Sequence, residues 1–187
     1  LLSHSAGIED GLTDRSSADT IPAYCTPGGE APSVSIQQLL TGGPDIDVDG
    51  PTRVSAVPGS AYRYANADYA ILQLLIEDVT GGTFPAFMDE AVLGALSMTS
   101  STYGQPLPPA LRSRAASEHG VSGEPLPGDR LHIPLLAAGG LWMTPSDMAS
   151  FLVEIMEDYH GRSDRLLSQA TAREMLAKQI AIVVNRP

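Results

Sequence analysis

The chain has 187 residues, of which 43% are hydrophobic and 18% charged, and its formal net charge is −11. This length fits one domain, or one domain and part of another, and the composition is typical of a folded chain. The acidic balance excludes a partner held through its phosphate backbone, so we expect no nucleic-acid binding. No apolar run reaches the length of a transmembrane segment, and the single cysteine, Cys25, cannot form an internal disulfide.

The first third of the sequence predicts little regular structure. Residues 1–7 have the pattern of a helix end that turns at Gly7, and a polar surface loop follows over 12–32. Ser35 has the position of an N-cap for a short helix that stops at the glycine pair 42–43. Acidic residues alternate in "GPDIDVDGP", but their spacing departs from a calcium loop and favours a solvated loop.

The clearest predicted helix begins at Asn66 and ends at the glycine pair 81–82. Thr83 then caps a second helix, with Pro85 in its first turn. Apolar residues recur at helical spacing in both. Those of the first helix are Ala70, Ile71, Leu74, Leu75 and Val79, and those of the second are Phe84, Phe87, Met88, Ala91 and Val92.

A long proline-containing stretch, 100–130, precedes the next predicted helix. Thr144, Pro145 and Asp147 supply the N-cap, the first-turn proline and the capping-box acid of that helix. Its expected buried face consists of Met148, Phe151, Leu152, Ile155 and Met156.

Ser168 caps a last helix, and the β-branched run 180–187 is a candidate start of a sheet strand. The chain is therefore predicted to be mostly α-helical, with large loops and hardly any sheet. No internal repeat is found, and we treat residues 1–187 as a single unit.

Several chemistries have no motif in the sequence. No two of the four histidines stand three or four residues apart and there is no cysteine pair, so a locally spaced zinc site is excluded. The G-x-x-x-x-G-K-[ST], G-x-G-x-x-G and G-x-S-x-G motifs are also missing. We expect neither a metal nor an organic cofactor.

Tyr64 and Asn66 lie where a loop enters the apolar helix, a place from which side chains can project into a cleft. A tyrosine beside the helix dipole could move a proton, and an asparagine offers a donor and an acceptor to a substrate amide. In the structural alternative, Asn66 is only the N-cap and Tyr64 packs beneath the loop. Taken alone, these residues favour the structural alternative.

Four sequence segments (phrases) that occur in a fixed order favour the functional interpretation instead: "LLSHSAGI", "PGSAYRYANADYAILQLLIEDVTGG", "LGALSMTSSTYG" and "AAGGLWMTPSDMASFL". Together they resemble the serine hydrolases of the class C β-lactamase group, which includes D-alanyl-D-alanine peptidases and related esterases. The resemblance covers nearly the whole chain. It implies the helical region of the β-lactamase/transpeptidase-like α/β serine hydrolase fold, with most of the antiparallel sheet not present.

The resemblance also implies site residues and a reaction. In the Y-x-N motif, Tyr64 would be the general acid/base and Asn66 would orient the substrate. Trp142, the only tryptophan, is a candidate for lining the substrate pocket, with core packing as the alternative. The implied reaction transfers the acyl group of an amide, lactam or ester to a serine and then to water. The expected partner is a small-molecule or peptide acyl substrate.

The phrase "LLSHSAGI" offers Ser3, His4 and Ser5 as a further candidate pair of serine and histidine. Adjacent residues on a turn rarely face one another. The resemblance makes this segment a structural turn near the floor of the cleft, so we expect no nucleophile there.

Two motifs of the family are missing from these residues. There is no S-x-x-K, because the one lysine, Lys178, has Met175 three positions before it, and no K-T-G or H-x-G follows the last helix. We therefore expect the middle of a longer protein, with the nucleophile in another segment or in a complementing chain, and a chain that is inactive alone.

Two alternatives stay open. One is a non-catalytic relative that binds peptide or peptidoglycan-like ligands, and the other is a helical structural domain in which Y-x-N is accidental. For a bacterial member, the resemblance implies export to the periplasm or the medium.

Overall fold

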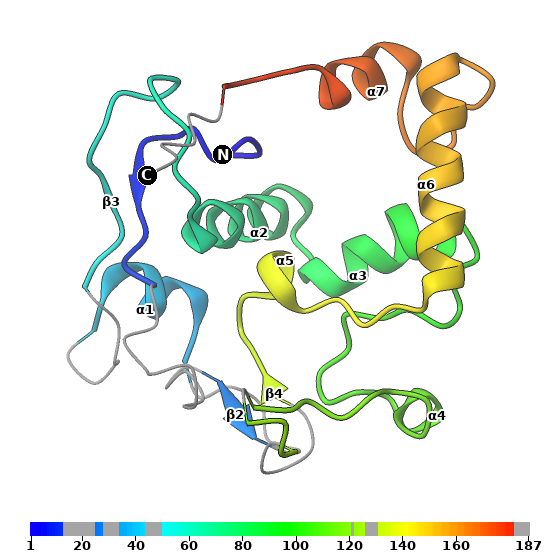
Figure 1. Ribbon diagram of the computed structural model, residues 1–187, viewed down its shortest axis with the longest axis horizontal. Coiled ribbons are helices and arrows are strands. Elements are labelled where there is room, and N and C mark those ends of the chain that lie inside the picture. Colours follow the sequence, from blue (N-terminus) through cyan, green and yellow to red (C-terminus); the bar gives the residue numbers. More distant parts are fainter. Residues whose placement is uncertain (13–24, 28–33, 44–49, 121, 126–130, 182–187) are drawn as a thin grey trace.

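The computed structural model describes residues 1–12, 25–27, 34–43, 50–120, 122–125 and 131–181. Helices predominate in them, as predicted. Helix α2 (Asn66–Thr80) lies at the centre, and three shorter helices pack against or beside it (Figure 1): α1 (Ile36–Thr41), α3 (Phe84–Met88) and α5 (Leu136–Gly139). The π-helical segment η1 (Asp89–Gly94) continues α3, and α4 (Pro109–Arg112) is a short helix in the proline-containing stretch.

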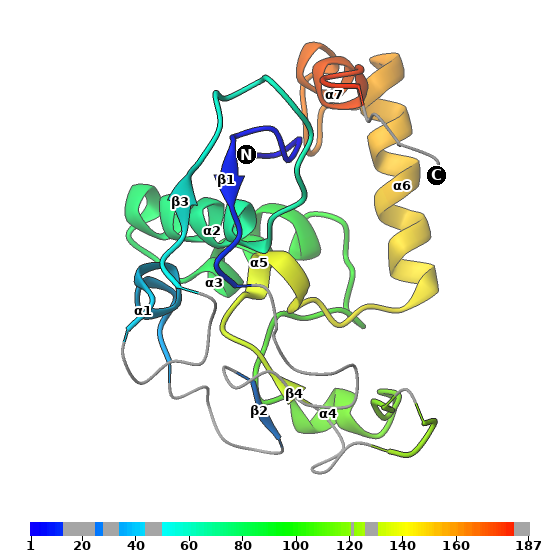
Figure 2. The same ribbon diagram turned by 60° about the vertical axis from the view of Figure 1, so that its left-hand side comes forward.

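The longest helix, α6 (Pro145–His160), stands at one edge of the molecule, with α7 (Gln169–Leu176) packed against one end of it (Figures 1 and 2). Two small antiparallel sheets complete the described structure. Strand β1 (Ile8–Glu9) pairs with β3 (Arg53–Val54), and β2 (Thr26–Pro27) pairs with β4 (Leu131–His132). None of the helices in the described ranges is long and apolar enough to cross a membrane.

The predicted N-caps are confirmed. Ser35 accepts a hydrogen bond from the Gln38 amide, the Gln38 side chain accepts one from the Ser35 amide, and Gly42 ends α1 with a left-handed φ of 65°. Hydroxyl caps also start α3, α6 and α7, at Thr83, Thr144 and Ser168.

The predicted helix end over residues 1–7 is wrong. A turn closed by the His4 amide and the Leu1 carbonyl leads into β1 instead. His4 and Gly7 have φ values of 50° and 73°, which a right-handed helix cannot contain. A Cβ at Gly7 would lie 2.1 Å from the Ala56 carbonyl oxygen, so glycine allows this segment to approach the loop that precedes α2.

The predicted apolar face of α2 is correct only near its start. Ala70 is buried and Ile71 and Leu74 pack on the core, but Leu75 and Val79 are 52% and 77% exposed. Asp68 and Gln73 are buried in their place, and the Gln73 side chain accepts a hydrogen bond from the Ala137 amide of α5. Polar contacts therefore set part of the buried face, which apolar spacing could not indicate.

Helix α6 departs from its prediction for the same reason. Ile155 is buried as expected, whereas Leu152 and Met156 are more than half exposed. The other buried residues of the helix are Glu154 and Asp158, which hold the segment leading to α7. Asp158 accepts a hydrogen bond from the Leu167 amide at 3.0 Å, and Glu154 lies 3.3 Å from the Arg165 guanidinium.

In the second predicted helix the π-helical segment shifts the buried positions by about one residue. Phe84 is buried and Met88 packs on the core as expected, but Leu93 is buried where Val92 was predicted. An i to i+5 turn adds a residue to the helical repeat, which rotates the apolar face.

Two clusters of buried side chains form the core. One joins β1, α1 and the start of α2, and the other joins α3, η1 and the segment after it. The first contains Ile8, Leu12, Ile36, Leu39, Ala65, Ala67, Ala70 and Leu135, and the second contains Phe84, Leu93, Met98 and Tyr103. Burial raises the pKa of the Tyr103 phenol.

Three sequence predictions lie largely or wholly outside the described residues. They are the polar loop over 12–32, the acidic run over 45–49 and the candidate strand over 180–187. Within the last of these, only residues 180–181 are described, and they are not in a strand.

The N-terminus of α2 is capped from a distance. Ala65 occupies the N-cap position and has no side-chain acceptor. The Asp10 carboxylate, which follows β1, accepts hydrogen bonds from the amides of Asn66 at 2.7 Å and Ala67 at 3.3 Å. The structural alternative in which Asn66 is the N-cap is therefore wrong.

Asp147 is not a capping-box residue. Its amide donates to Thr144 as expected, but its carboxylate accepts from the Ser100 amide at 3.0 Å and from the Ser101 hydroxyl at 2.7 Å. It thereby fixes the start of the proline-containing stretch to α6. The sequence pattern was right about the helix start and wrong about the side chain's partner.

We expect Asp10→Ala to lower the free energy of unfolding by about 1–2 kcal/mol, because two amides of α2 lose a charged acceptor. Asp10→Asn should lose less, since its amide oxygen still accepts one hydrogen bond. Urea denaturation of the protein measures the difference, with exposed Glu9→Ala as the matched control. Equal stabilities of Asp10→Ala and Glu9→Ala would contradict the remote cap.

Asp147→Ala should cost about 2–3 kcal/mol, since it removes a charged acceptor and leaves the buried Ser101 hydroxyl unpaired. Exposed Ser146→Ala, on the same helical turn, is the control and should change stability by less than about 0.5 kcal/mol. The same denaturation measurement applies. A loss for Asp147→Ala no larger than that of the control would show that the hydrogen bonds from Ser100 and Ser101 to Asp147 do not stabilise the fold.

Candidate functional site

Tyr64 and Asn66 face each other at the start of α2. The Tyr64 hydroxyl donates a hydrogen bond of 2.8 Å to Asn66 Oδ1, and the Tyr64 side chain is 58% exposed. Tyr64 is more exposed than the structural alternative, a half-buried ring beneath the loop, would require, although one face of its ring contacts His4. The pair presents a phenol and a carboxamide together on an accessible surface.

The remote cap leaves the Asn66 side chain free of a capping role. Because Asp10 occupies the first amides of α2, Asn66 Oδ1 can accept from Tyr64 instead. This bond also assigns the orientation of the amide, with oxygen toward the phenol. The Nδ2 group makes no hydrogen bond within the described residues, so two N–H donors are available to a ligand.

His4 lies behind Tyr64 in a cluster of aromatic rings. The centroids of the His4 and Tyr64 rings are 4.6 Å apart, and the Tyr69 and Tyr62 rings lie at 5.3 and 6.0 Å from that of His4. The Tyr69 hydroxyl donates to the Leu2 carbonyl at 3.2 Å. The opening turn of the chain and the entry to α2 thus share one aromatic cluster.

The imidazole of His4 is bound to the first turn of α2. Its Nδ1 lies 3.1 Å from Asp68 Oδ2 and 3.3 Å from the Ala65 amide nitrogen, and one ring nitrogen cannot donate to the first and accept from the second at once. We assign the proton to Nδ1, because the shorter contact is to a carboxylate that is 1% exposed. Asp68 Oδ1 has no hydrogen-bond partner within the described residues, so His4 is the polar contact of this buried carboxylate.

Backbone hydrogen bonds hold the same two segments together. The His4 and Ser5 carbonyls accept from the amides of Arg63 and Gly59, at 2.8 and 2.7 Å. The segment 1–10 therefore runs along the loop that leads into α2 (Figure 2). Ser3 and Ser5 bond to each other at 2.8 Å, while His4 turns to Asp68. As expected, no serine–histidine pair forms here.

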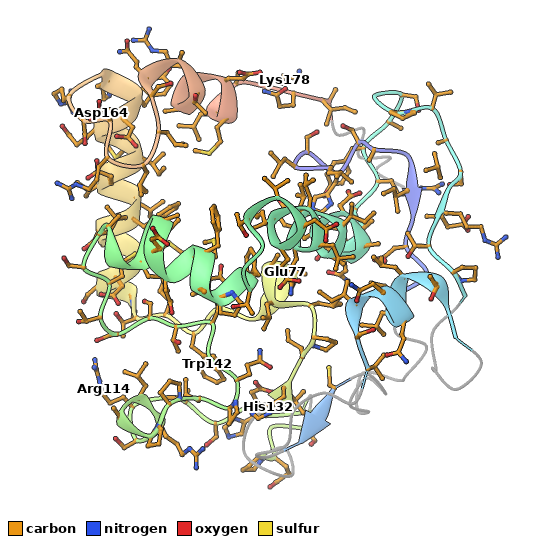
Figure 3. All side chains as sticks on the ribbon, turned by 180° about the vertical axis from the view of Figure 1, so that it is seen from behind. Glu77, Arg114, His132, Trp142, Asp164 and Lys178 are labelled. Atoms are coloured by element: carbon orange, nitrogen blue, oxygen red, sulfur yellow. The ribbon has the colours of Figure 1, made fainter. Side chains whose placement is uncertain are left out.

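Trp142 lies in another part of the molecule. Figure 3 shows it with Arg114 on one side and His132 on the other, and its backbone pairs with Thr102 through two hydrogen bonds of 2.9 Å. It lines a hollow of about 280 Å³ with Gln105 and Glu118 and a smaller one beside Arg114, neither of which contains Tyr64 or Asn66. The structure thus joins two of the three predicted site residues, and the role of Trp142 stays a prediction.

Sequence reasoning missed the residues that contact Tyr64 and the start of α2. Asp10 and Asp68 were not singled out, and His4 was considered only as a partner of serine. One signal was available for Asp10: a helix whose N-cap position holds alanine needs an acceptor from elsewhere. No cluster of three or more metal-binding side chains occurs in the part of the chain that the structure describes.

Comparisons with known proteins give the family. The model of the Beta-lactamase family matches residues 1–184. Among solved structures, a D-stereospecific amidohydrolase from Streptomyces sp. is 17% identical with a TM-score of 0.65, over 94% of this chain and 49% of its own. The D-amino acid amidase from Ochrobactrum anthropi SV3 is 20% identical with a TM-score of 0.61, over 92% of this chain and 46% of its own. These two similarities show the fold.

A relative from Escherichia coli (strain K12) bears the name "Putative D-alanyl-D-alanine carboxypeptidase" and is 26% identical over 94 residues. That match covers 50% of this chain and 21% of the relative, and the chain spans less than half of each of the two solved structures. The order of the four sequence phrases, the helical fold and a family model that spans residues 1–184 agree: the chain belongs to the beta-lactamase family of serine hydrolases.

Proposed function

We propose that this chain supplies the Y-x-N part of the active site of an acyl-transferring serine hydrolase. Tyr64 acts as general acid/base, and Asn66 orients the carbonyl or amide group of the substrate. The serine nucleophile comes from outside these 187 residues, in the whole protein or in a complementing chain, because no S-x-x-K occurs within them.

One observation carries the proposal. At the start of α2, the hydroxyl of the exposed Tyr64 lies 2.8 Å from Oδ1 of Asn66, whose carboxamide has no capping role. A phenol that only filled space would be buried, and an asparagine that only capped the helix would bind its amides. The positive end of the α2 dipole lies beside the pair and favours negative charge that develops near it. Both features suit a group that transfers a proton during acyl transfer.

The proposed reaction has two steps. The serine Oγ forms a bond to the acyl carbon while its proton passes through Tyr64 to the leaving nitrogen, whose bond to the acyl carbon breaks. Water then attacks the acyl-serine, and one of its protons returns through Tyr64 to the serine Oγ as the acid is released. In both steps the free Nδ2 donors of Asn66 hold the substrate.

Relatives favour an amide as the bond that is cleaved. The two structural neighbours reported above are named as an amidase and an amidohydrolase, and the Escherichia coli relative is named for a carboxypeptidase. We therefore extend the proposal to small amides and peptides with an exposed acyl carbon. The second candidate is a ligand-binding relative without turnover, which the absence of an S-x-x-K motif upstream of Leu1 in the whole protein would favour.

In the whole protein, Tyr64→Phe should lower kcat/KM for an amide by about 10²–10⁴-fold, because a general acid/base contributes rate enhancement of that size. Binding of the amide should change little, since the ring stays in place. Steady-state kinetics measure both effects. Tyr159→Phe on α6 is the matched control and should retain wild-type activity.

Asn66→Ala should raise KM and lower kcat/KM by about tenfold to a hundredfold, the cost of one or two lost substrate hydrogen bonds. Wild-type activity in both the Tyr64→Phe and Asn66→Ala variants would overturn the proposed roles. Tight amide binding without turnover, unchanged by Tyr64→Phe, would instead support the ligand-binding candidate.

A further inference from the structure

We propose that His4 is the positioning residue of Tyr64: anchored by Asp68, its imidazole holds the phenol ring in the orientation that proton transfer requires. This inference deepens the proposed function and rests on it for its catalytic meaning. The spatial arrangement itself rests on geometry alone: a buried carboxylate contacts an imidazole, and the imidazole contacts an exposed phenol.

The first link is the contact between Asp68 and His4. The carboxylate is 1% exposed, the imidazole is 15% exposed, and the two are joined at 3.1 Å. Asp68 belongs to the first turn of α2, where a negative charge is favoured by the helix dipole. Within the described residues Asp68 Oδ1 has no hydrogen-bond partner, so the contact with His4 is the one that offsets the burial of this carboxylate.

The second link is the contact between His4 and Tyr64. Their rings lie 4.6 Å apart with an interplanar angle of 42°, the shortest of the ring contacts that His4 makes in the described residues. Tyr64 is 58% exposed, so few other groups can restrict its side chain. The imidazole contacts one side of the phenol ring, and the hydrogen bond to Asn66 holds the phenol hydroxyl.

The third observation is the backbone of His4. Its φ of 50° is uncommon for a residue other than glycine and costs free energy, so the contacts around His4 must hold this backbone in place. The His4 carbonyl accepts from the Arg63 amide, next to Tyr64, at 2.8 Å. Backbone and side chain of His4 therefore act on the same short segment.

A comparison of two substrates distinguishes a loss of the orientation of Tyr64 from a general loss of structure or activity. An amide needs a proton delivered to its leaving nitrogen, whereas a nitrophenyl ester has a leaving group stable as an anion. We expect Tyr64→Phe to lower kcat more for the amide than for the ester. His4→Ala should show the same preference, with a loss of about tenfold to a hundredfold on the amide and a smaller loss on the ester.

Two further variants sharpen the comparison. Asp68→Asn retains an oxygen acceptor for the Nδ1 proton and should keep most of the activity that Asp68→Ala loses. In a Tyr64→Phe background, His4→Ala should cause little additional loss, because both changes act through the same group. Exposed His160→Ala on α6 is the matched control and should leave both substrates unaffected.

A readout without turnover keeps this inference distinct from the proposed function. In protein with ¹³C-labelled tyrosine rings, the NMR signals of Tyr64, assigned by their loss in Tyr64→Phe, should move in His4→Ala while those of Tyr159 stay in place. Unchanged Tyr64 signals, or equal losses on amide and ester, would overturn the positioning role. Shifted signals in a protein that never turns over would refute the proposed function and leave the positioning role standing.

Discussion

The carboxylate of Asp10 is the contact on which the rest of this site depends. It binds the first two amides of α2 from outside the helix, at 2.7 and 3.3 Å, and so replaces the cap that Ala65 cannot provide. A helix normally satisfies these amides with the side chain beside them. Since Asp10 does so here, the carboxamide of Asn66 is not used for capping and accepts the hydrogen bond of Tyr64.

The same contact explains why the opening segment belongs to the site. Asp10 places β1 against the entry of α2, and residues 4–7 then follow the loop 55–63 through a series of backbone hydrogen bonds. Gly7 allows the approach because a Cβ there would collide with Ala56. His4 reaches Asp68 and Tyr64 only because the two segments run side by side (Figure 2).

Local signals in the sequence predicted the helices well, and distant contacts were the part that they could not predict. Ser35, Thr83, Thr144 and Ser168 were recognised as caps because the acceptor and donor lie three residues apart. Asp10 caps α2 across 56 residues, and nothing in the intervening sequence indicates which acid would do so.

The buried faces of the helices were also predicted only in part. Apolar spacing failed where polar side chains are buried, as with Gln73, whose partner is 64 residues away, and Asp158, whose partner is nine residues away. It also failed where a π-helical turn rotates the face at Leu93. Tyr64 and Asn66 stand two positions apart, and their candidate role was recognisable from the ordered sequence segments that resemble the family, not from the pair alone. His4, whose ring contacts Tyr64, is bound to Asp68, which lies 64 residues away along the chain.

The central claim is that Tyr64 and Asn66 serve a serine held elsewhere in the whole protein. The most direct measurement is intact mass spectrometry after reaction with a labelled penicillin or a fluorophosphonate, followed by peptide mapping of the adduct. The account predicts a single adduct on a serine in an S-x-x-K sequence outside residues 1–187. An adduct on Ser3 or Ser5, or no adduct under any condition that preserves the fold, would contradict it.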